Sequence, residues 1–194
     1  MSLVIMESDP RQRMIETAAV VMRERGVEAT SFSEVIARSG APRGSIYHHF
    51  PGGKAQLIEE ATRYAGEYTA ASIANALWQD DPIAAIRAAT GTWLKLLRRS
   101  DFGAGCPVVA ASLDATQPSG AREAAGEAFS RWQQALAEAL EPHGLEPERA
   151  RSLAALIISS IEGAVVLSRA TRSLKPLERV ATELEGLIAG AISR

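Results

Sequence analysis

The sequence predicts an all-α protein of about nine helices. Alanine is abundant, and apolar residues recur at spacings of three and four along almost the whole chain. No segment shows the alternating pattern of β-branched residues that is typical of strands. Hydrophobic residues make up 46% of the 194 residues and charged residues 23%, which are values of an ordinary globular protein rather than a disordered chain.

Turn-forming residues divide the first fifty residues into short helices. Asp9 and Pro10 supply an N-cap and a favoured first helical residue, and Gly26 supplies a stop for the helix that follows. Thr30 and Ser31 offer N-caps for the next helix, and a Gly-Ala-Pro run breaks the chain before a third. Three helices are therefore expected: one at about residues 10–25, one that follows these caps and runs through Arg38, and one at about residues 43–50.

The rest of the chain is predicted to form longer helices separated by breaks rich in glycine and proline. These helices are expected at residues 54–78, 82–99, 106–114, 120–140, 147–171 and 175–193. We expect two domains, a three-helix domain at residues 1–53 and a larger helical domain at residues 54–194.

The second and third short helices have the pattern of a helix-turn-helix. Phe32 and Val35 are placed to face inward on the first of the two, and Ile46 and Phe50 to bury the back of the second. Gly40 lies between them and allows the positive φ of a tight turn. The pattern predicts two helices held at a fixed angle, with one face of the second left exposed.

That exposed face has the chemistry of a DNA-reading surface. It carries Arg43, Ser45, Tyr47 and His48, and no carboxylate that would repel phosphate. A recognition helix presents such residues to base edges in the major groove. We therefore expect double-stranded DNA as a partner.

The overall charge gives no independent support for DNA binding. The chain has a formal net charge of −2, and residues 1–66 hold eight basic and eight acidic side chains. Attraction to phosphate must then come from where the charges lie, with help from helix N-termini and backbone amides.

The motif resembles that of the TetR family of repressors. In that family a glycine turn precedes a recognition helix of the form Lys/Arg-Gly-Thr/Ser-hydrophobic-Tyr, followed by Phe and Lys. The matching residues here are Gly40, Arg43, Gly44, Ser45, Ile46, Tyr47, Phe50 and Lys54. The run at residues 41–54, with the later Gly-Cys-Pro at 105–107, resembles the LmrA/YxaF-like branch. The candidate DNA-binding residues are Thr30, Ser31, Arg43, Gly44, Ser45, Tyr47, His48 and Lys54.

The resemblance implies a cytoplasmic regulator, most simply a repressor, that binds a palindromic operator as a dimer and is released by a small hydrophobic effector. The helix that begins at Lys54 would carry the signal from the effector site to the DNA-binding helices. The alternative is an all-α enzyme, or a binding protein, for a hydrophobic small molecule. Cys106 or His143 would then be the chemical residue, but no spacing in the sequence pairs a nucleophile with a base.

An effector site is expected in the larger domain because it combines aromatic residues with a few polar ones, as ligand pockets do. The candidate ligand-binding residues are Trp93, Cys106, Ser112, Phe129, Trp132, Ser159 and Glu162. Individual aromatic residues among these could equally be ordinary core.

A dimer interface is expected near the C-terminus. The stretch from Leu153 to Leu167 is apolar almost all round the helix, which requires burial on two sides. The last helix supplies an apolar stripe that could join it in a four-helix bundle with a second copy. The candidate interface residues are Gly163, Leu167, Val180, Leu184, Leu187, Ile188 and Ala191. The alternative is a core layer within a monomer.

Neither a metal site nor a cofactor is predicted. Cys106 is the sole cysteine, and the adjacent His48 and His49 would diverge by about 100° on a helix. The Leu153 to Leu167 stretch is shorter than the ~20 residues of a membrane span, so we expect no membrane partner.

Overall fold

The computed structural model describes residues 9–42, 44–77, 81–114 and 120–192, and its helices confirm the all-α prediction. Within these ranges there is no strand. The helices are α1 (Pro10–Arg25), α2 (Phe32–Ser39), α3 (Ser45–His49), α4 (Gly53–Leu77), α5 (Pro82–Arg99), α6 (Pro107–Ser112), α7 (Gly120–Leu140), α8 (Pro147–Thr171) and α9 (Lys175–Ile192), with a 3-10 turn η1 (Glu141–His143) after α7.

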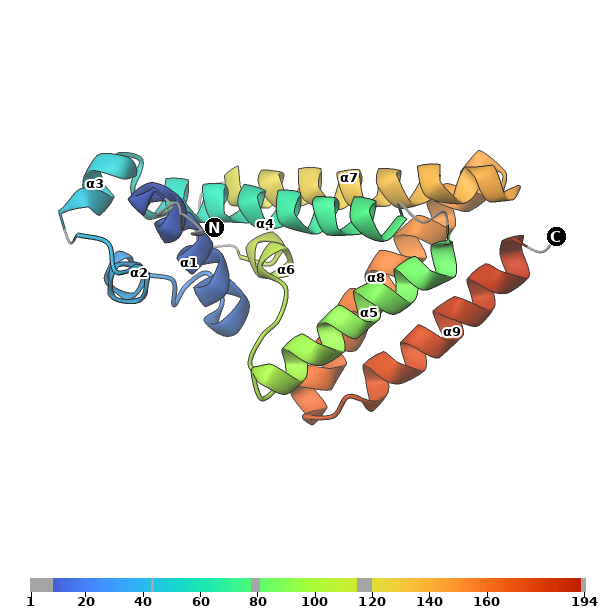
Figure 1. The fold of residues 1–194 in the computed structure, drawn as a ribbon. Coiled ribbons are helices and arrows are strands. Elements are labelled where there is room, and N and C mark those ends of the chain that lie inside the picture. The colour runs from blue at the N-terminus through green and yellow to red at the C-terminus, as the bar shows by residue number, and fades with distance from the viewer. Residues whose placement is uncertain (1–8, 43, 78–80, 115–119, 193–194) are drawn as a thin grey trace, which may run out of the picture.

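The helices form a head and a body that share one long helix. Figure 1 shows α1, α2 and α3 gathered at one end of α4, while α5, α8 and α9 lie toward its other end. α4 and α7 run side by side along the length of the molecule, and α6 lies between the head and the body. α4 is therefore the element that joins the head to the rest of the chain.

Several helix ends differ from the predicted boundaries for local reasons. α2 begins at Phe32, after Ser31, one of the two expected N-caps, whose hydroxyl accepts from Glu34 N at 3.2 Å, and it ends at Ser39, one residue beyond the predicted Arg38. α6 is shorter than predicted because Cys106 is its N-cap and Leu113 its C-cap. The predicted ends at residues 43, 78 and 193 lie outside the described residues.

Two clusters of buried residues hold the molecule together. One joins the head to α4, α6 and α7 through residues such as Met14, Phe50, Leu57 and Trp132. The other joins α5, α8 and α9. The apolar interior of the head is thus continuous with that of α4 and α7, so the head cannot tilt without moving side chains that also touch α7.

α4 and α7 approach closely at Gly66. A Cβ at this position would lie 2.7 Å from the Cβ of Ala128, so only glycine allows the observed spacing. The indole Nε1 of Trp132 donates to the carbonyl oxygen of Gly66 at 2.9 Å, which fixes the register of the two helices. This contact makes α7 a direct neighbour of the helix that carries the head.

α8 is the central helix of the second cluster. Among the described residues it is the one helix whose length and hydropathy would suffice to cross a membrane, a test that core helices also pass. Leu153, Ile157, Ile161 and Val165 are buried against neighbouring helices. Burial of these residues accounts for the apolar character of one side of α8. The apolar side chains on its other side are exposed in this chain.

Candidate functional site

The turn between α2 and α3 has the geometry that the sequence predicts. Gly40 has φ 66° and ψ 15°, the left-handed conformation that favours glycine. Val35 of α2 and Ile46 of α3 are fully buried, so each helix is fixed against the core of the head. The opposite side of α3 faces outward.

The outward face of α3 carries aromatic and imidazole side chains. Tyr47 is 70% exposed, and its ring packs edge-on against Phe32 with centroids 5.4 Å apart. His48 is also exposed, whereas the hydroxyl of Ser45 donates to the carbonyl oxygen of Pro42 at 2.7 Å. α3 itself contains no Asp or Glu. The predicted Arg43 lies outside the described residues.

Gly44 precedes α3 and is open to solvent. Its φ of −78° and ψ of −17° are ordinary right-handed values. No heavy atom lies within 4 Å of the position that a Cβ would occupy. A side chain at this position would therefore fit the protein and project from the exposed face.

The structure corrects the prediction for Thr30 and qualifies two others. Thr30 is fully buried and its hydroxyl donates to the carbonyl oxygen of Gly26 at 2.9 Å, so it closes the turn after α1 and does not face outward. The hydroxyl of Ser31 accepts from Glu34 N as the N-cap of α2, so it already has one hydrogen-bond partner. Lys54 Nζ donates to the carbonyl oxygen of Glu28 at 2.8 Å, which ties the start of α4 to the head.

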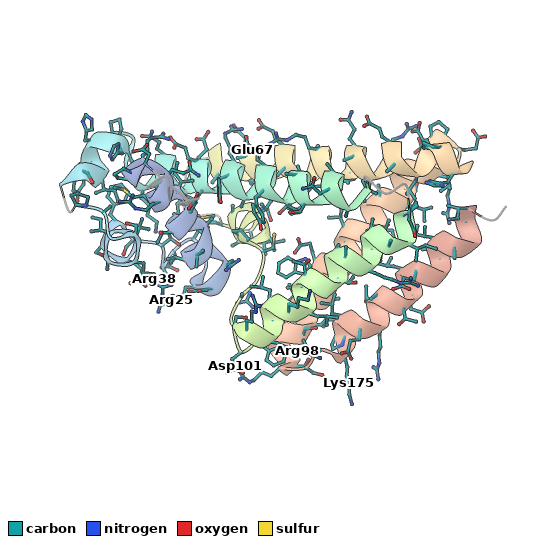
Figure 2. All side chains as sticks on the ribbon, in the orientation of Figure 1. Arg25, Arg38, Glu67, Arg98, Asp101 and Lys175 are labelled. Atoms are coloured by element: carbon teal, nitrogen blue, oxygen red, sulfur yellow. The ribbon has the colours of Figure 1, made fainter. Side chains whose placement is uncertain are left out.

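Arginine side chains form ion pairs with Glu24 and Glu34 where α1 meets α2. Arg38 lies 2.7 Å from Glu24 and 2.6 Å from Glu34, and Arg25 lies 3.2 Å from Glu34. Figure 2 shows Arg25 and Arg38 together at the edge of the head formed by α1 and α2. Such partly exposed pairs add little to stability, but they neutralise Glu24 and Glu34 on the surface of the head.

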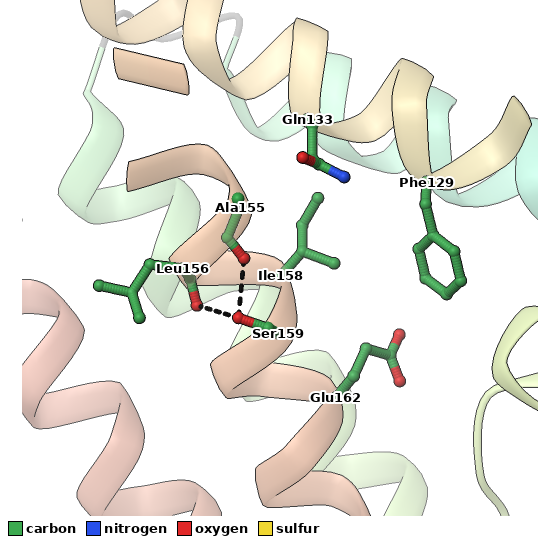
Figure 3. A pocket seen from close by; sticks show the side chains of 7 residues that line it. All are labelled: Phe129, Gln133, Ala155, Leu156, Ile158, Ser159 and Glu162. Carbon is green, nitrogen blue, oxygen red and sulfur yellow. Dashed lines mark hydrogen bonds between the residues drawn. The ribbon is translucent and has the colours of Figure 1, made fainter. Parts of the chain in front are cut away.

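A cavity of about 620 Å³ opens between α7 and α8. Apolar side chains make up most of its wall, and the exposed Leu156 and Ser159 lie at its mouth. Figure 3 shows Glu162 directed into the space below Phe129. The lining residues are Phe129, Gln133, Ala155, Leu156, Ile158, Ser159 and Glu162. Their spacing on α8 is that of one helical face.

A second cavity of about 370 Å³ lies where the end of α1 meets α6 and α8. Its wall includes Arg23 of α1, Cys106 before α6 and Arg169 of α8. The backbone of Gly105 donates to the carbonyl oxygen of Arg23 at 2.7 Å, so this junction also links the head to the body. Glu162 lines both cavities.

Glu162 and Cys106 lie together in the wall of the second cavity, where each side chain is partly buried. Burial raises the pKa of the Glu162 carboxyl to about 7, and the hydrogen bond from Cys106 offsets part of that rise. Burial, followed by the charge of Glu162, raises the pKa of the Cys106 thiol well above its ordinary value. Cys106 is therefore a neutral thiol and not a reactive thiolate.

The structure brings together four of the predicted ligand-binding residues. Phe129, Ser159 and Glu162 line the first cavity, and Cys106 lines the second with Glu162. Gln133, four residues after Phe129, and Leu156, three before Ser159, were missed. Helical spacing from the residues already chosen would have identified both.

Three other predicted ligand-binding residues line neither of these two cavities. Trp132 is buried between α4 and α7, where its indole binds Gly66. Trp93 packs against the cluster formed by α5, α8 and α9. The hydroxyl of Ser112 donates to the carbonyl oxygen of Val109 at 2.8 Å. Large apolar rings are equally suited to a core and to a pocket, and here the rings of Trp132 and Trp93 pack in the core clusters.

The predicted dimer residues divide into exposed and buried groups. Gly163 and Leu167 of α8 are exposed, with Leu167 56% accessible. Leu184 and Ile188 of α9 are buried against the body of their own chain, so they are unavailable to a second copy and the prediction for them is corrected. Packing against the same cluster also partly covers Val180, Leu187 and Ala191.

The exposed apolar side chains of α8 form a continuous face. Leu156 and Val166, which the sequence analysis did not single out, are 44% and 53% exposed and lie on the same side of the helix as Gly163 and Leu167. Within the ranges that the structure describes, no group of three His, Cys, Asp or Glu side chains is arranged to hold a metal ion.

Two family models match the chain, one in its N-terminal part and one in its C-terminal part. Residues 14–61 match the family model described as bacterial regulatory proteins, tetR family. Residues 82–183 match the model of the LmrA/YxaF-like transcriptional regulator C-terminal domain.

Relatives match over nearly the whole chain. An uncharacterized HTH-type transcriptional regulator of Mycobacterium tuberculosis, Rv0196, is 42% identical and covers 92% of this chain and 94% of its own. The HTH-type transcriptional regulator LmrA of Bacillus subtilis is 30% identical and covers 93% of this chain and 97% of its own. The crystal structure of a TetR transcriptional regulator from Legionella pneumophila has the same fold, with a TM-score of 0.85 over 94% of this chain and 99% of its own at 23% identity.

Proposed function

This chain belongs to the TetR family of transcriptional regulators, in its LmrA/YxaF-like branch, and we propose that it is a dimeric repressor released from a palindromic operator by a small hydrophobic effector. The family consists of DNA-binding regulators and not of enzymes. The observation that carries the proposal is the exposed, carboxylate-free face of α3 on a head that shares its apolar core with α4 and α7.

In this proposal residues 1–53 read DNA and residues 54–194 sense the effector and dimerise. α3 enters the major groove with Tyr47 and His48 outward, and Gly44 allows close approach to the DNA backbone. Arg43, Ser45 and Lys54 are proposed to supply further DNA contacts, and Ser31 is proposed to contribute at the start of α2. Two heads related by a two-fold axis would meet half-sites about 34–36 Å apart.

The effector is proposed to act through α4. The cavity between α7 and α8 is lined by Phe129, whose ring contacts that of Trp132 with centroids 5.2 Å apart. Trp132 in turn binds Gly66 of α4. An effector that favours a shifted position of α7 would therefore move α4 and the head. Such a ligand must bind the DNA-free conformation more tightly than the DNA-bound one.

The exposed apolar face of α8 is proposed to be the centre of the dimer interface. Leu156, Gly163, Val166 and Leu167 would pack against the same residues of a second copy, as in a two-fold symmetric interface. Gly163 has no heavy atom within 4 Å of a Cβ position, so the surface there is open to another helix. A regulator of chromosomal genes would act in the cytoplasm, where we propose that this chain is located.

Leu167→Arg is expected to convert the dimer to a monomer. Leu167 is exposed in one chain, so arginine leaves the fold intact but would place two unpaired charges at the two-fold axis. Sedimentation would show the change in mass, and circular dichroism would show unchanged helix content. Tyr68→Arg is the matched control, because Tyr68 is a large exposed side chain on a different helix, α4. A Leu167→Arg protein that remains dimeric would place the interface elsewhere.

Lys54→Ala is expected to weaken binding to all DNA sequences alike. Its ammonium has donors besides the one given to Glu28, and it lies at the start of a helix, where phosphate is favoured. The slope of log affinity against log salt should fall by about 0.9 per protomer. Fluorescence anisotropy at several salt concentrations measures this slope. Lys54→Arg should preserve it, and a loss of preference at one base pair would instead indicate base contact.

Selection of bound fragments from random DNA tests the proposed function directly. The purified protein should enrich an inverted repeat, and one dimer should cover both halves. Adding apolar compounds to the complex should identify some that release the DNA. Enrichment of sequences without two-fold symmetry, or of no sequence, would overturn the proposal.

A further inference from the structure

Glu162 is an acidic side chain in an unusual place. It lies on α8 in the wall of both cavities, among Phe129, Ile158 and Val165. It takes part in no ion pair with another described residue, and the thiol of Cys106 lies beside it in the wall of the second cavity. A buried carboxylate without a cation is costly, and proteins seldom keep one that has no use.

We propose that the effector is a cationic amphiphile, an apolar molecule with a protonated amine, whose ammonium pairs with the Glu162 carboxylate. This inference rests on the proposed function and names the chemical class of the effector. The apolar part of the molecule lies along Phe129 and Ile158, and the ammonium reaches Glu162 where Figure 3 shows its carboxyl directed into the cavity.

The shape and polarity of the first cavity fit such a molecule. Its volume of about 620 Å³ is within the range of small-molecule sites. Gln133 and Ser159 are the other polar residues in its wall, and the Ser159 hydroxyl already donates to the carbonyl oxygens of Ala155 and Leu156 at 2.8 and 3.2 Å. Glu162 is therefore the one charged group that this cavity offers among the described residues.

The positive charges around the second cavity disfavour an amine there, so the amine is expected in the first cavity. Arg23 and Arg25 of α1 and Arg169 of α8 line the second cavity, and their guanidinium groups would repel an ammonium. Glu24 also lies there, but it is paired with Arg38. The ammonium thus approaches Glu162 from the side of α7, where the described residues that line the first cavity include no other charged side chain.

Pairing with an amine requires Glu162 to be ionised, which makes binding depend on pH. Its raised pKa of about 7 leaves about half of the molecules protonated at neutral pH. An ammonium in the cavity would lower this pKa, so binding releases a proton. Affinity for an amine should therefore rise about tenfold between pH 6 and pH 8. Cys106, whose pKa is raised well above its ordinary value, stays a neutral thiol across this range.

Three ligands of one shape distinguish charge from apolar contact. Phenylhexylamine, phenylhexanol and phenylhexanoate share the same apolar part and carry a cation, a neutral hydroxyl and an anion. Titration calorimetry of the unmodified protein should rank the amine at least about tenfold above the alcohol at pH 8, with the carboxylate weakest. An alcohol or carboxylate that binds as tightly as the amine would overturn the inference.

Proton release can be measured without any mutation. Titration of the amine at pH 7 in two buffers of different ionisation enthalpy should report release of about half a proton for each ligand bound, and the alcohol should release none. Glu162→Gln should abolish both the proton release and the preference for the amine, while keeping the affinity for the alcohol. Glu183→Gln, on the exposed side of α9, is the matched control and should change neither.

Failure of this inference can be told apart from failure of the proposed function. Operator binding in the absence of any ligand is measured on the same protein samples. Loss of specific operator binding would overturn the proposed function, whereas intact operator binding with no preference for the amine would overturn the inference about Glu162 alone.

Discussion

Gly44→Val is expected to abolish operator binding while leaving the protein folded and dimeric. The valine side chain would stand between the start of α3 and the DNA backbone, because the space beside Gly44 is open in the free protein and its backbone angles suit any residue. Several contacts of about 1 kcal/mol each would be lost together, so operator affinity should fall at least about 100-fold. Fluorescence anisotropy with labelled operator measures the loss.

Gly91→Val is the matched control for this substitution. Gly91 lies on α5, far from the head, and also has no heavy atom within 4 Å of its Cβ position. It should bind operator as the parent does. Operator affinity of the Gly44→Val protein within a few-fold of the parent would contradict the docking of α3 in the groove.

Leu184→Asp is expected to unfold the body of the protein rather than to separate a dimer. Leu184 is 4% exposed among the packed side chains of α5, α8 and α9, and aspartate is too short to bring its carboxylate to water. The free energy of unfolding should fall by about 4 kcal/mol or more, which is a large part of the stability of an ordinary domain. Urea unfolding followed by circular dichroism measures it.

Two controls separate burial from other effects of this substitution. Thr182→Asp introduces the same charge at an exposed position of α9 and should change stability by less than about 0.5 kcal/mol. Leu184→Met keeps the apolar volume and should cost less than about 1.5 kcal/mol. A Leu184→Asp protein with parental stability and the mass of a monomer would restore this residue to the dimer interface.

The helix-turn-helix could be predicted because its signals are local. The N-cap at Ser31, the left-handed turn at Gly40 and the buried spacing of Val35 and Ile46 each follow from neighbouring residues. The element order could be predicted for the same reason, since glycine and proline mark most of the breaks. The open space at Gly44 is also local, because it follows from the exposed start of a short helix.

The partners of apolar side chains could not be predicted, because they depend on elements distant in the chain. Trp132 could have lined a pocket, but the structure places it against Gly66, 66 residues away. The stripe on α9 could have faced a second copy, but Leu184 and Ile188 face α5 and α8. A periodic pattern identifies the buried side of a helix and leaves open what covers it.

The same limit applied to the polar residues. Thr30 looked available as a DNA contact, but its hydroxyl closes the turn at Gly26. Glu162 was chosen from composition alone, and only the fold shows that it lines two cavities and has no ion pair with another described residue. Sequence identified which side chains carry chemistry, and tertiary packing decided which of them are free to use it.

The continuity of α4 restricts how proteins of this shape can vary in length. α4 has 25 residues without a break, is tied to the head at Lys54 and is held in register with α7 at Gly66. One residue inserted between these two points would rotate the head by about 100° and advance it by about 1.5 Å relative to the body. Both heads of a dimer would then miss their half-sites together. Insertions and deletions should therefore accumulate in the loops between α5, α6 and α7 and be rare within the first half of α4.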